Sequence, residues 1–405
     1  MSHPPNPSES STMTPLERRS SASLALIFAF RMLGLFLVMP VFALEARHYP
    51  NGDDPALVGL AMGIYGLTQG LLQIPFGMAS DRVGRKRVMV LGLVLFALGS
   101  GIAAWASTLE WLIIGRAVQG SGAISAAVTA LLADQTRDAV RTKAMAMIGA
   151  SIGLVFSLSL VLSPLLNAVL GLSGLFMLTT FLALAGIAVV LWWVPAEPAR
   201  HANHIPLGIM TSLHNVLTQP TLLRLNAGVF ILHAVQLAMW VALPAMLEQA
   251  GLPKNSHWQV YLPAVLGSFV VMGGTLFPME RRGYLRGIFL TAIALIALVQ
   301  IGLLMMATPS VISIAWVVFL FFCGFNILEA SQPSMTSRAA ASQVRGTALG
   351  VYNSLQSLGL FTGGALGGWL VKAHGVPTLF GACAAAMLLW LIVAWAMPST
   401  PAKAK

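Results

Sequence analysis

The sequence predicts an all-α integral membrane protein with twelve transmembrane helices, arranged as two six-helix halves. Three observations support this fold class. The 405-residue chain is 57% hydrophobic and 9% charged, so most of its side chains need lipid as their solvent. Twelve apolar stretches each approach the ~20 residues that a helix needs to cross a bilayer. One long polar stretch divides these segments six against six.

Each predicted span is a helix rather than a barrel strand because its apolar run is continuous, whereas barrel strands alternate between apolar and polar residues. A helix also satisfies its backbone polar groups within one segment, as lipid requires. In chain order, the predicted spans are 20–45, 56–79, 87–106, 109–133, 143–165, 173–194, 221–247, 257–279, 285–306, 311–336, 346–371 and 376–397.

The basic residues predict the orientation of these spans. Arg47, Lys254 and Lys372 fall on one side of the twelve-span arrangement, and the arginines and lysines of the other connections fall on the opposite side. By the positive-inside rule, the side richer in basic residues is cytoplasmic, and it holds both termini. This placement explains the net charge of +10 without nucleic-acid binding.

The spacing of polar segments predicts the domain organisation. A Ser- and Pro-rich start predicts a disordered tail, and the Pro-rich stretch in the middle predicts a linker. The predicted parts are a cytoplasmic tail at 1–19, an N-terminal half at 20–194, a cytoplasmic linker at 195–220, a C-terminal half at 221–397 and a short cytoplasmic tail at 398–405.

The two halves share an internal repeat. The segment Arg141-Thr-Lys-Ala is echoed by Arg345-Gly-Thr-Ala, and Pro40 of the first span is echoed by Pro244 of the seventh. Both pairs lie 204 positions apart. This offset predicts a duplicated six-helix unit, with a substrate site near the midplane between the repeats.

A basic loop joins the second and third spans, with the sequence Gly77-x-x-x-Asp81-Arg82-x-Gly84-Arg85-Lys86-Arg87. Gly84 permits a tight reversal, and the arginines can stay at the membrane interface. Asp81 can pair with them or face the positive end of a neighbouring helix. Taken alone, such a loop is an orientation signal or a contact with anionic lipid.

This loop, the span count and the central linker resemble the major facilitator superfamily. So does a signature in the fourth span, Leu112-x-x-x-Arg116-x-x-Gln119-Gly120-x-Gly122-Ala123. Shorter motifs around Arg31, Tyr65 and Phe325 are similar to the YajR-like branch of its drug:proton antiporters. The resemblance implies a transporter of the bacterial inner membrane that works as a monomer.

The resemblance also implies a set of gating residues. In this family the loop aspartate, Asp81 here, holds the two halves together on the cytoplasmic side when the transporter opens outward. An acidic residue at the end of the fourth helix, here Asp134, assists it. The expected conformational gating set is Gly77, Asp81, Arg82, Gly84, Arg85, Arg116, Asp134, Arg137 and Arg141.

The sequence departs from this family in two places. It ends soon after the twelfth predicted span, where the protein that gives this branch its name carries a soluble C-terminal domain. The fifth span contains Ser163-Pro164-Leu-Leu-Asn167, where the antiporter signature has Gly-Pro followed by a pair of glycines. The second departure weakens the prediction of an antiporter more than the prediction of a transporter.

Glu329 and His233 are the predicted proton-coupling residues. Glu329 is the one acidic residue deep in a predicted span, and His233 is the one histidine inside a span, at similar depth in the seventh. Apolar surroundings disfavour a charged carboxylate, so Glu329 can load and release a proton as access alternates. The alternatives are a permanently neutral, hydrogen-bonded acid and a histidine that only packs. Arg31, an intramembrane cation, can balance Glu329 or bind an anionic group.

Helices one, four, seven and ten surround the central cavity in this superfamily, which implies a cavity with few charges and several amides. Such a lining suits a medium-sized amphipathic molecule better than a sugar, which needs many fixed hydrogen bonds. The predicted substrate-binding residues are Arg31, Gln119, Gln236, Trp240, Asn326 and Glu329.

We therefore expect a proton-coupled secondary transporter, most simply one that exports small drug-like molecules. A proton-coupled importer of a nutrient or metal complex uses the same residues with the opposite coupling. An enzyme is disfavoured because no spacing indicates a metal-ligand cluster or a nucleophile beside a base. The expected partners are a small molecule, protons and the lipid bilayer. No cofactor is expected besides the proton gradient, and no metal or nucleic acid.

Overall fold

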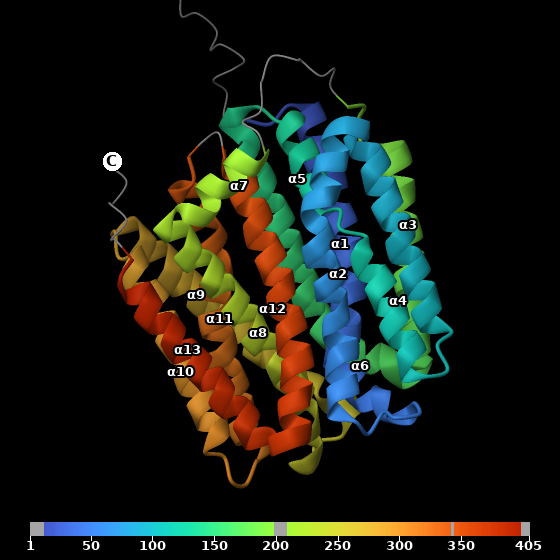
Figure 1. Cartoon of the computed structure of the whole chain (residues 1–405), viewed down its shortest axis with the longest axis vertical. Helices are drawn as coiled ribbons and strands as arrows, with labels where there is room; N and C mark the ends of the chain where they lie inside the picture. The colour runs from blue at the N-terminus through green and yellow to red at the C-terminus, as the bar shows by residue number, and fades with distance from the viewer. Residues whose placement is uncertain (1–11, 198–208, 342–343, 398–405) are drawn as a thin grey trace, which may run out of the picture.

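The computed structural model describes residues 12–197, 209–341 and 344–397, and these residues form a helical bundle without strands (Figure 1). The all-α prediction is therefore confirmed. The predicted tails up to residue 11 and from residue 398, with residues 198–208 of the predicted linker, lie outside the described residues. The helices are α1 (Pro15–Glu45), η1 (Ala46–His48), α2 (Pro55–Val83), α3 (Arg85–Ala104), α4 (Leu109–Ser121), α5 (Ser125–Asp134), α6 (Asp138–Ala188), η2 (Val189–Trp193), α7 (Ile209–Thr218), α8 (Pro220–Gln249), η3 (Lys254–Ser256), α9 (Trp258–Arg281), α10 (Leu285–Leu304), α11 (Val311–Ala339), α12 (Arg345–His374) and α13 (Val376–Trp395).

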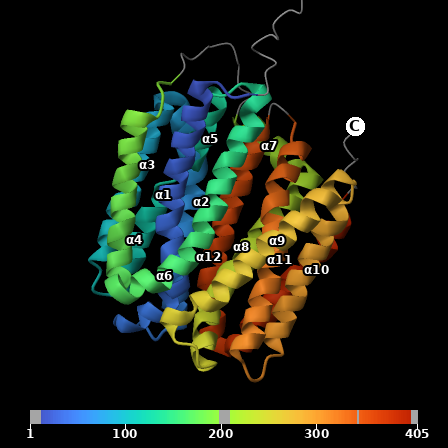
Figure 2. The ribbon, with the colours of Figure 1, turned by 180° about the vertical axis from the view of Figure 1, so that it is seen from behind.

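Nine helices in the described part of the chain are long and apolar enough to cross a membrane. One of them covers most of α6, whose 51 residues would extend ~77 Å at 1.5 Å per residue, too far for one crossing. Gly171 interrupts it with φ 65° and ψ 179°, a conformation that favours glycine. Figure 2 shows the chain reversing there, at the lower end of the bundle. Two predicted spans, 143–165 and 173–194, thus lie along α6 and η2.

The predicted fourth span, 109–133, is divided into α4 and α5 by a non-helical step at 122–124. Close packing explains the break, since a methyl group on Gly122 would overlap the carbonyl oxygen of Gly92 on α3. The twelve-span count requires α4 and α5 together to make one crossing, and α12 another. Neither is among the nine candidate helices, so the count of twelve stays a prediction.

The first helix begins earlier than predicted, at Pro15 instead of residue 20. The reason is a capping box: the Thr14 hydroxyl accepts a hydrogen bond from the backbone of Glu17, and the Glu17 carboxylate accepts one from the backbone of Thr14. Part of the predicted linker is also helical. It forms α7, which packs against α8 and α12 at the upper end of the bundle in Figure 1.

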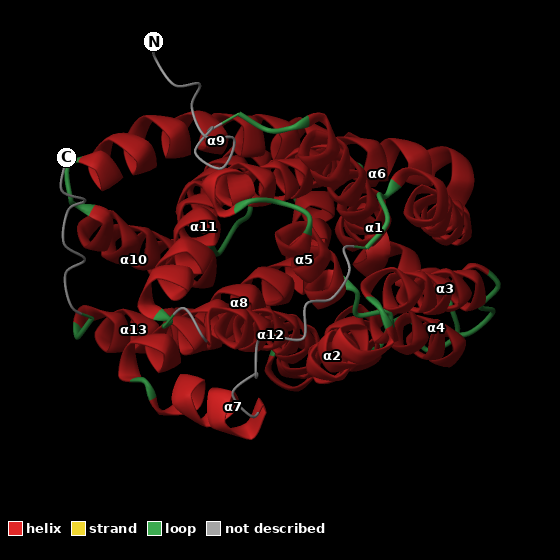
Figure 3. Ribbon diagram, turned by 90° about the horizontal axis from the view of Figure 1, so that it is seen from above, coloured by secondary structure: helices red, strands yellow, loops and turns green. Residues whose placement is uncertain are grey.

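We call the upper end in Figure 1, where α2 ends and α3 begins, the basic end, and the opposite end the far end. Viewed along this axis, the helices α1–α6 lie on one side and α8–α13 on the other (Figure 3). We call these groups the N half and the C half.

The two halves meet most closely where α2 packs along α12. Glycines line this contact on α2. A methyl group on Gly59 would overlap the carbonyl oxygen of Gly364, one on Gly63 would lie 2.7 Å from that of Phe361, and one on Gly66 would overlap that of Ser357. Small residues at such spacing let two membrane helices approach backbone to backbone. We call this contact the α2–α12 seam.

Candidate functional site

Glu329 on α11 and His233 on α8 lie in contact. His233 Nε2 is 3.3 Å from Glu329 Oε2. The histidine side chain is 4% exposed and the glutamate side chain 39%. His233 Nδ1 lies 2.9 Å from the carbonyl oxygen of Val229. Because that oxygen can only accept, Nδ1 carries a hydrogen, and Nε2 is the nitrogen that faces the carboxylate.

Gln356 on α12 is the third member of this group. Its amide nitrogen lies 2.7 Å from His233 Nε2 and donates to Glu329 Oε1 at 3.3 Å. Sequence reasoning missed Gln356. An amide in an apolar span belongs to no motif here, and the sequence alone does not show which faces of α8, α11 and α12 meet.

A chain of aromatic rings lies beside the pair on its far-end side. Phe325, one turn before Glu329 on α11, has its ring centroid 5.8 Å from that of His233. The Phe322 ring then lies 5.8 Å from Phe156, which lies 5.0 Å from Phe36. Because Phe36 and Phe156 belong to the N half, the rings bridge the two halves. They lie on the far-end side of Glu329, whose side chain is partly exposed although its Oε2 atom is buried.

Arg31 on α1 does not meet Glu329 but is 1% exposed inside the N half. Its guanidinium donates to the hydroxyls of Ser125 at 3.1 Å and Tyr65 at 2.9 Å, and to Gln69 Oε1 at 3.2 Å. Its Cζ also lies 5.7 Å from the ring centre of Phe96. These neutral acceptors and the ring stabilise a buried cation without a carboxylate.

Arg116 on α4 is held in a similar way at 3% exposure. It donates to the carbonyl oxygens of Ala61 and Met62 on α2, at 3.4 and 3.2 Å, and to Gln119 Oε1 at 2.8 Å. Gln119 in turn donates to the hydroxyl of Ser100 on α3. Arg116 and Gln119 thus fasten α2, α3 and α4 together within the N half.

The predicted substrate-binding residues of the C half are also engaged in packing. Asn326 donates to the hydroxyl of Ser268 on α9 at 2.8 Å, and the Trp240 ring meets the edge of Tyr261 with centroids 5.1 Å apart. Gln236 is 6% exposed. Among the six predicted substrate residues, Glu329 is therefore the one with a partly exposed side chain, and the structure does not gather the other five, all buried, around it.

The far end is closed by three ion pairs, each between an N-half and a C-half residue. We call them the far-end latch. Lys254 Nζ lies 2.6 Å from Glu45, Lys372 Nζ 2.6 Å from Asp54, and an Arg47 nitrogen 3.4 Å from Glu248. The predicted topology places all three basic members on the side poor in basic residues. In the sequence these three residues stand out because they lie on the side with few basic residues. Their acidic partners could be identified only from the structure.

The predicted gating loop is built at the basic end. Arg85 forms an ion pair with Asp81, and its Nε lies 3.3 Å from Asp134 Oδ2. Gly84, with φ 123°, ends α2 and precedes the first residue of α3. The carboxylate of Glu197 accepts from the backbone of Lys86 at 2.7 Å and so caps α3. Arg85 is thus the shared partner of both predicted gating carboxylates.

Other members of the predicted gating set tie down neighbouring elements. Arg137 binds the Glu17 carboxylate, with Nε 2.8 Å from Oε1. Arg141 donates to the carbonyl oxygens of Ala133 and Thr136, near the end of α5. Gly77 packs against Ala126 of α5, and Arg82 closes the last turn of α2. The pairs of Arg85 with Asp81 and Asp134 and of Arg137 with Glu17 each join two residues of the N half.

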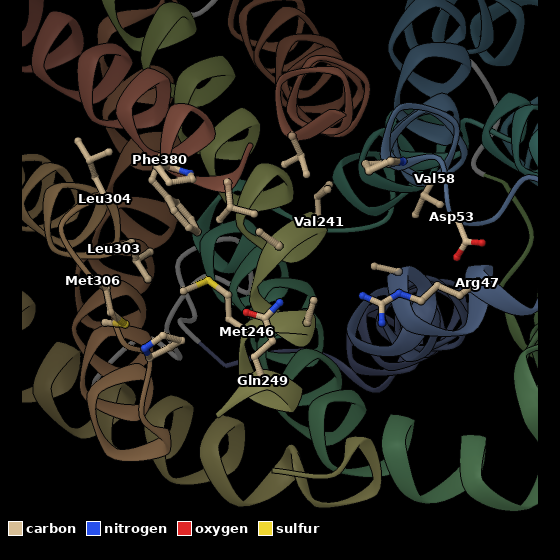
Figure 4. A pocket seen from close by; sticks show the side chains of 18 of the residues that line it. Arg47, Asp53, Val58, Val241, Met246, Gln249, Leu303, Leu304, Met306 and Phe380 are labelled. Carbon is tan, nitrogen blue, oxygen red and sulfur yellow. The ribbon is translucent and has the colours of Figure 1, made fainter. Parts of the chain in front are cut away.

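A cavity of about 400 Å³ lies at the far end between the halves. Figure 4 shows Arg47 and Asp53 on its N-half side and Met246, Gln249 and Phe380 on its C-half side. None of the predicted substrate residues lines it. It borders the far-end latch through Arg47, so its shape depends on how the halves meet.

Comparison with known proteins agrees with this architecture. The chain matches the family model of the Major Facilitator Superfamily over residues 24–364 and again over 279–405. It is 42% identical to the inner membrane transport protein YajR of Escherichia coli, over 96% of this chain and 85% of that protein. It is 24% identical to multidrug resistance protein 1 of Bacillus subtilis over 92% of this chain and 95% of that protein, and 27% identical to the class B tetracycline resistance protein of Escherichia coli over 55% and 57%.

Solved structures share the fold at low identity. The human organic anion transporter MFSD10 superposes with a TM-score of 0.69 at 18% identity, covering 94% of this chain and all of that one. A bacterial homologue of the lysosomal transporter Spinster gives a TM-score of 0.70 at 15% identity, covering 95% and 97%. The helical architecture, the full-length family match and the 42% identical relative show that this chain is a multi-pass transporter, not an enzyme, and belongs to the major facilitator superfamily.

Proposed function

We propose that this protein is a proton-coupled secondary active transporter that exports small amphipathic, drug-like molecules by alternating access. The proposed location is the bacterial inner membrane, with the basic end in the cytoplasm. The observation that carries the proposal is the contact between Glu329 and His233 midway along α11 and α8, with the glutamate side chain partly exposed.

The chemistry of this contact suits proton transfer. Glu329 has no arginine or lysine within ion-pairing distance among the described residues, so its charge depends on its own proton and on His233. A carboxylate in apolar surroundings gains more from neutralisation than one in water. Protonation of Glu329 removes this charge. It therefore changes the free energy of packing the C half against the N half.

The arrangement of the halves supports alternating access. The α2–α12 seam, the aromatic rings and the far-end latch close the far end. In the proposed topology, this is the state open to the cytoplasm. Opening the far end then requires the latch to break, and the loop around Asp81 would hold the basic end closed. The ion pairs that break and form during the proposed cycle are thus weak contacts between the halves. Contacts at one end can therefore be replaced by contacts at the other.

The proposed substrate class rests on distant relatives and on the side chains beside the site. The distant relatives named for multidrug and tetracycline resistance are similar to this chain in sequence over the matched lengths. Phe156 and Phe322 border the site, and aromatic walls suit lipophilic molecules. The proton gradient is the proposed energy source, with the monomer as the working unit.

Oriented vesicles test this function. Right-side-out and inside-out vesicles containing the protein are given a pH gradient of either sign, with tetracycline and a panel of lipophilic cations as probes. Export is supported when the probe moves opposite to the proton flux reported by a pH-sensitive dye. Probe and proton moving together would identify the importer instead. A probe flux that ignores the gradient in both orientations would overturn proton coupling.

A further inference from the structure

The side-chain amide of Gln356 bridges the two members of the proton-coupling pair. Its nitrogen lies within hydrogen-bonding distance of His233 Nε2, at 2.7 Å, and of Glu329 Oε1, at 3.3 Å. Three helices of the C half therefore meet at one amide: α8 through His233, α11 through Glu329 and α12 through Gln356 itself.

The donors and acceptors of this group show which protonation state lets Gln356 use both of its amide hydrogens. His233 Nδ1 carries a hydrogen because it faces a carbonyl oxygen, so Nε2 of the neutral ring has a lone pair. An ionised Glu329 is also an acceptor. An amide NH₂ group has two hydrogens and can serve both acceptors at once. When no proton lies between the histidine and the carboxylate, both amide hydrogens therefore have acceptors, while Glu329 Oε2 has no hydrogen-bond partner in the described structure.

Adding a proton to the pair disrupts this arrangement. A proton on Glu329 Oε2 or on His233 Nε2 would occupy the histidine lone pair. One amide hydrogen of Gln356 would then lose its acceptor, and a buried donor without an acceptor is costly. Conversely, the amide donates to the carboxylate that remains when the Glu329 O–H bond breaks and its proton passes to water at the basic end.

The opposite face of α12 forms the seam with the N half. Ser357, next to Gln356, meets Gly66 of α2, and Leu358 packs against Gly70. On the C-half side, Gly359 lies against the backbone of Phe230 on α8. The residues around Gln356 are therefore fixed between α8 and α2 while the far end is closed. A movement of α12 along the seam would displace the amide from the pair.

We propose that Gln356 is a positioning residue that favours proton release from Glu329 while the far end is closed, and that it withdraws when α12 shifts along the α2–α12 seam. This proposal rests on the proposed proton-carrier function. It adds a reason for the proton to leave at the basic end: the closed seam holds a donor against the ionised carboxylate.

Three side chains around the amide can titrate: Glu329 from α11, His233 from α8 and Tyr352 from α12. Tyr352 is 2% exposed, interacts electrostatically with Glu329, and has a hydroxyl without a hydrogen-bond partner in the described structure. In the N half, the terminal nitrogens of Arg31 donate to Ser125, Tyr65 and Gln69, while its Nε has no hydrogen-bond partner in the described structure. A Tyr352→Phe variant therefore distinguishes the effect of the Tyr352 hydroxyl from the effect of the Gln356 amide in the experiment below.

The test measures the protonation of Glu329 directly and needs no substrate. Purified full-length protein in lipid nanodiscs is titrated with protons while infrared spectroscopy follows the band of the protonated carboxyl, assigned by its loss in Glu329→Gln. The far end is held closed by cysteines at Asp54 and Lys372 joined by a short bifunctional maleimide. Gln356→Met keeps the side-chain length and removes both donors. It should raise the titration midpoint by about one pH unit, a tenfold gain in proton affinity.

Matched variants sharpen the result. Gln356→Asn, which is one methylene shorter, should shift the midpoint in the same direction. Gln73→Met is the control, because Gln73 on α2 is 1% exposed and neither its side-chain nitrogen nor its oxygen has a hydrogen-bond partner among the described residues. Tyr352→Phe should leave the effect of Gln356→Met in place. Without the cross-link, the shift should shrink as the protein spends time with the far end open.

The possible failures are distinct. If the Glu329 band titrates but Gln356→Met and Gln356→Asn leave its midpoint unchanged in the cross-linked protein, the role of Gln356 is wrong and the proton carrier stands. If Glu329→Gln removes no titrating band, the pair carries no proton. The proposed function then loses its carrier, and the role of Gln356 falls with it.

Discussion

The ammonium of Lys372 lies 2.6 Å from Asp54 Oδ2 and joins the last turn of α12 to the residue that caps α2. Asp54 has two roles, because its other oxygen, Oδ1, accepts from the backbone of Ala56 at 2.9 Å. The pair therefore fixes the start of α2 against the end of α12, at the far end of the seam between the halves.

Neutralising the latch should favour opening of the far end. Each exposed ion pair contributes at most about 1 kcal/mol, so Lys372→Gln should change the ratio of open to closed molecules by up to about fivefold. The readout is the rate at which a hydrophilic maleimide labels Val58→Cys, which lines the far-end cavity. Arg338→Gln is the control, since Arg338 pairs with Glu280 inside the C half. Equal labelling in both backgrounds would mean that the latch does not hold the halves.

Salt, and not mild acid, should weaken this pair. The hydrogen bond from Lys372 lowers the pKa of Asp54, so its contribution is complete above the ordinary value of about 3.9 and is lost as the pH falls through the lowered value. Labelling at Val58→Cys should therefore not respond to Asp54 between about pH 5 and 8. It should rise in about 1 M salt, where the screening length falls to roughly 3 Å. A rise near pH 6 that Asp54→Asn removes would contradict this.

The sequence predicted the helical class well because the apolar runs are long. Length and composition alone make α10 and α13 candidate membrane spans. The start of α1 was misplaced because the capping box at Thr14 and Glu17 extends the helix beyond its apolar part. The break between α4 and α5 could not be predicted, because it depends on the contact of Gly122 with α3.

The candidate site was predicted in part. Glu329 and His233 could be selected because an ionisable group in an apolar span is conspicuous. Their contact and the bridge by Gln356 depend on the rotation of three helices about their axes, which a nearly uniform apolar sequence does not encode. For the same reason, Arg31 could not be assigned to the interior of the N half, where its partners Tyr65 and Ser125 come from other helices.

A methyl group in the seam should disfavour the closed far end. In Gly63→Ala the new carbon would lie 2.7 Å from the carbonyl oxygen of Phe361, so the two backbones must separate. Labelling of Val58→Cys should rise, and the melting temperature should fall. Gly149→Ala in α6 has no atom within 4 Å of the new carbon and should gain up to about 1 kcal/mol of helix propensity. If both variants melt above the parent, the seam is not tightly packed.

The basic-end cluster should act as a unit. Asp81 and Asp134 share Arg85, so removing either carboxylate weakens the same group. In the proposed cycle, Asp81→Asn should shift the population toward molecules open at the basic end, by up to about fivefold. Asp81→Asn with Asp134→Asn should change the population by less than the two single effects combined. Accessibility of cysteines placed along the basic-end halves of α6 and α9 would measure this, and simple additivity would count against a shared cluster.

Transport driven by a pH gradient in Glu329→Gln proteoliposomes tests the proton-carrier role most directly. Glutamine keeps the shape of the protonated acid but cannot release a proton, so gradient-driven transport should be lost while exchange without net proton movement persists. Glu329→Asp should retain part of the activity with an altered pH dependence, and His233→Ala should slow turnover without removing coupling. An undiminished response of Glu329→Gln to the pH gradient would contradict the role of Glu329 as the proton carrier.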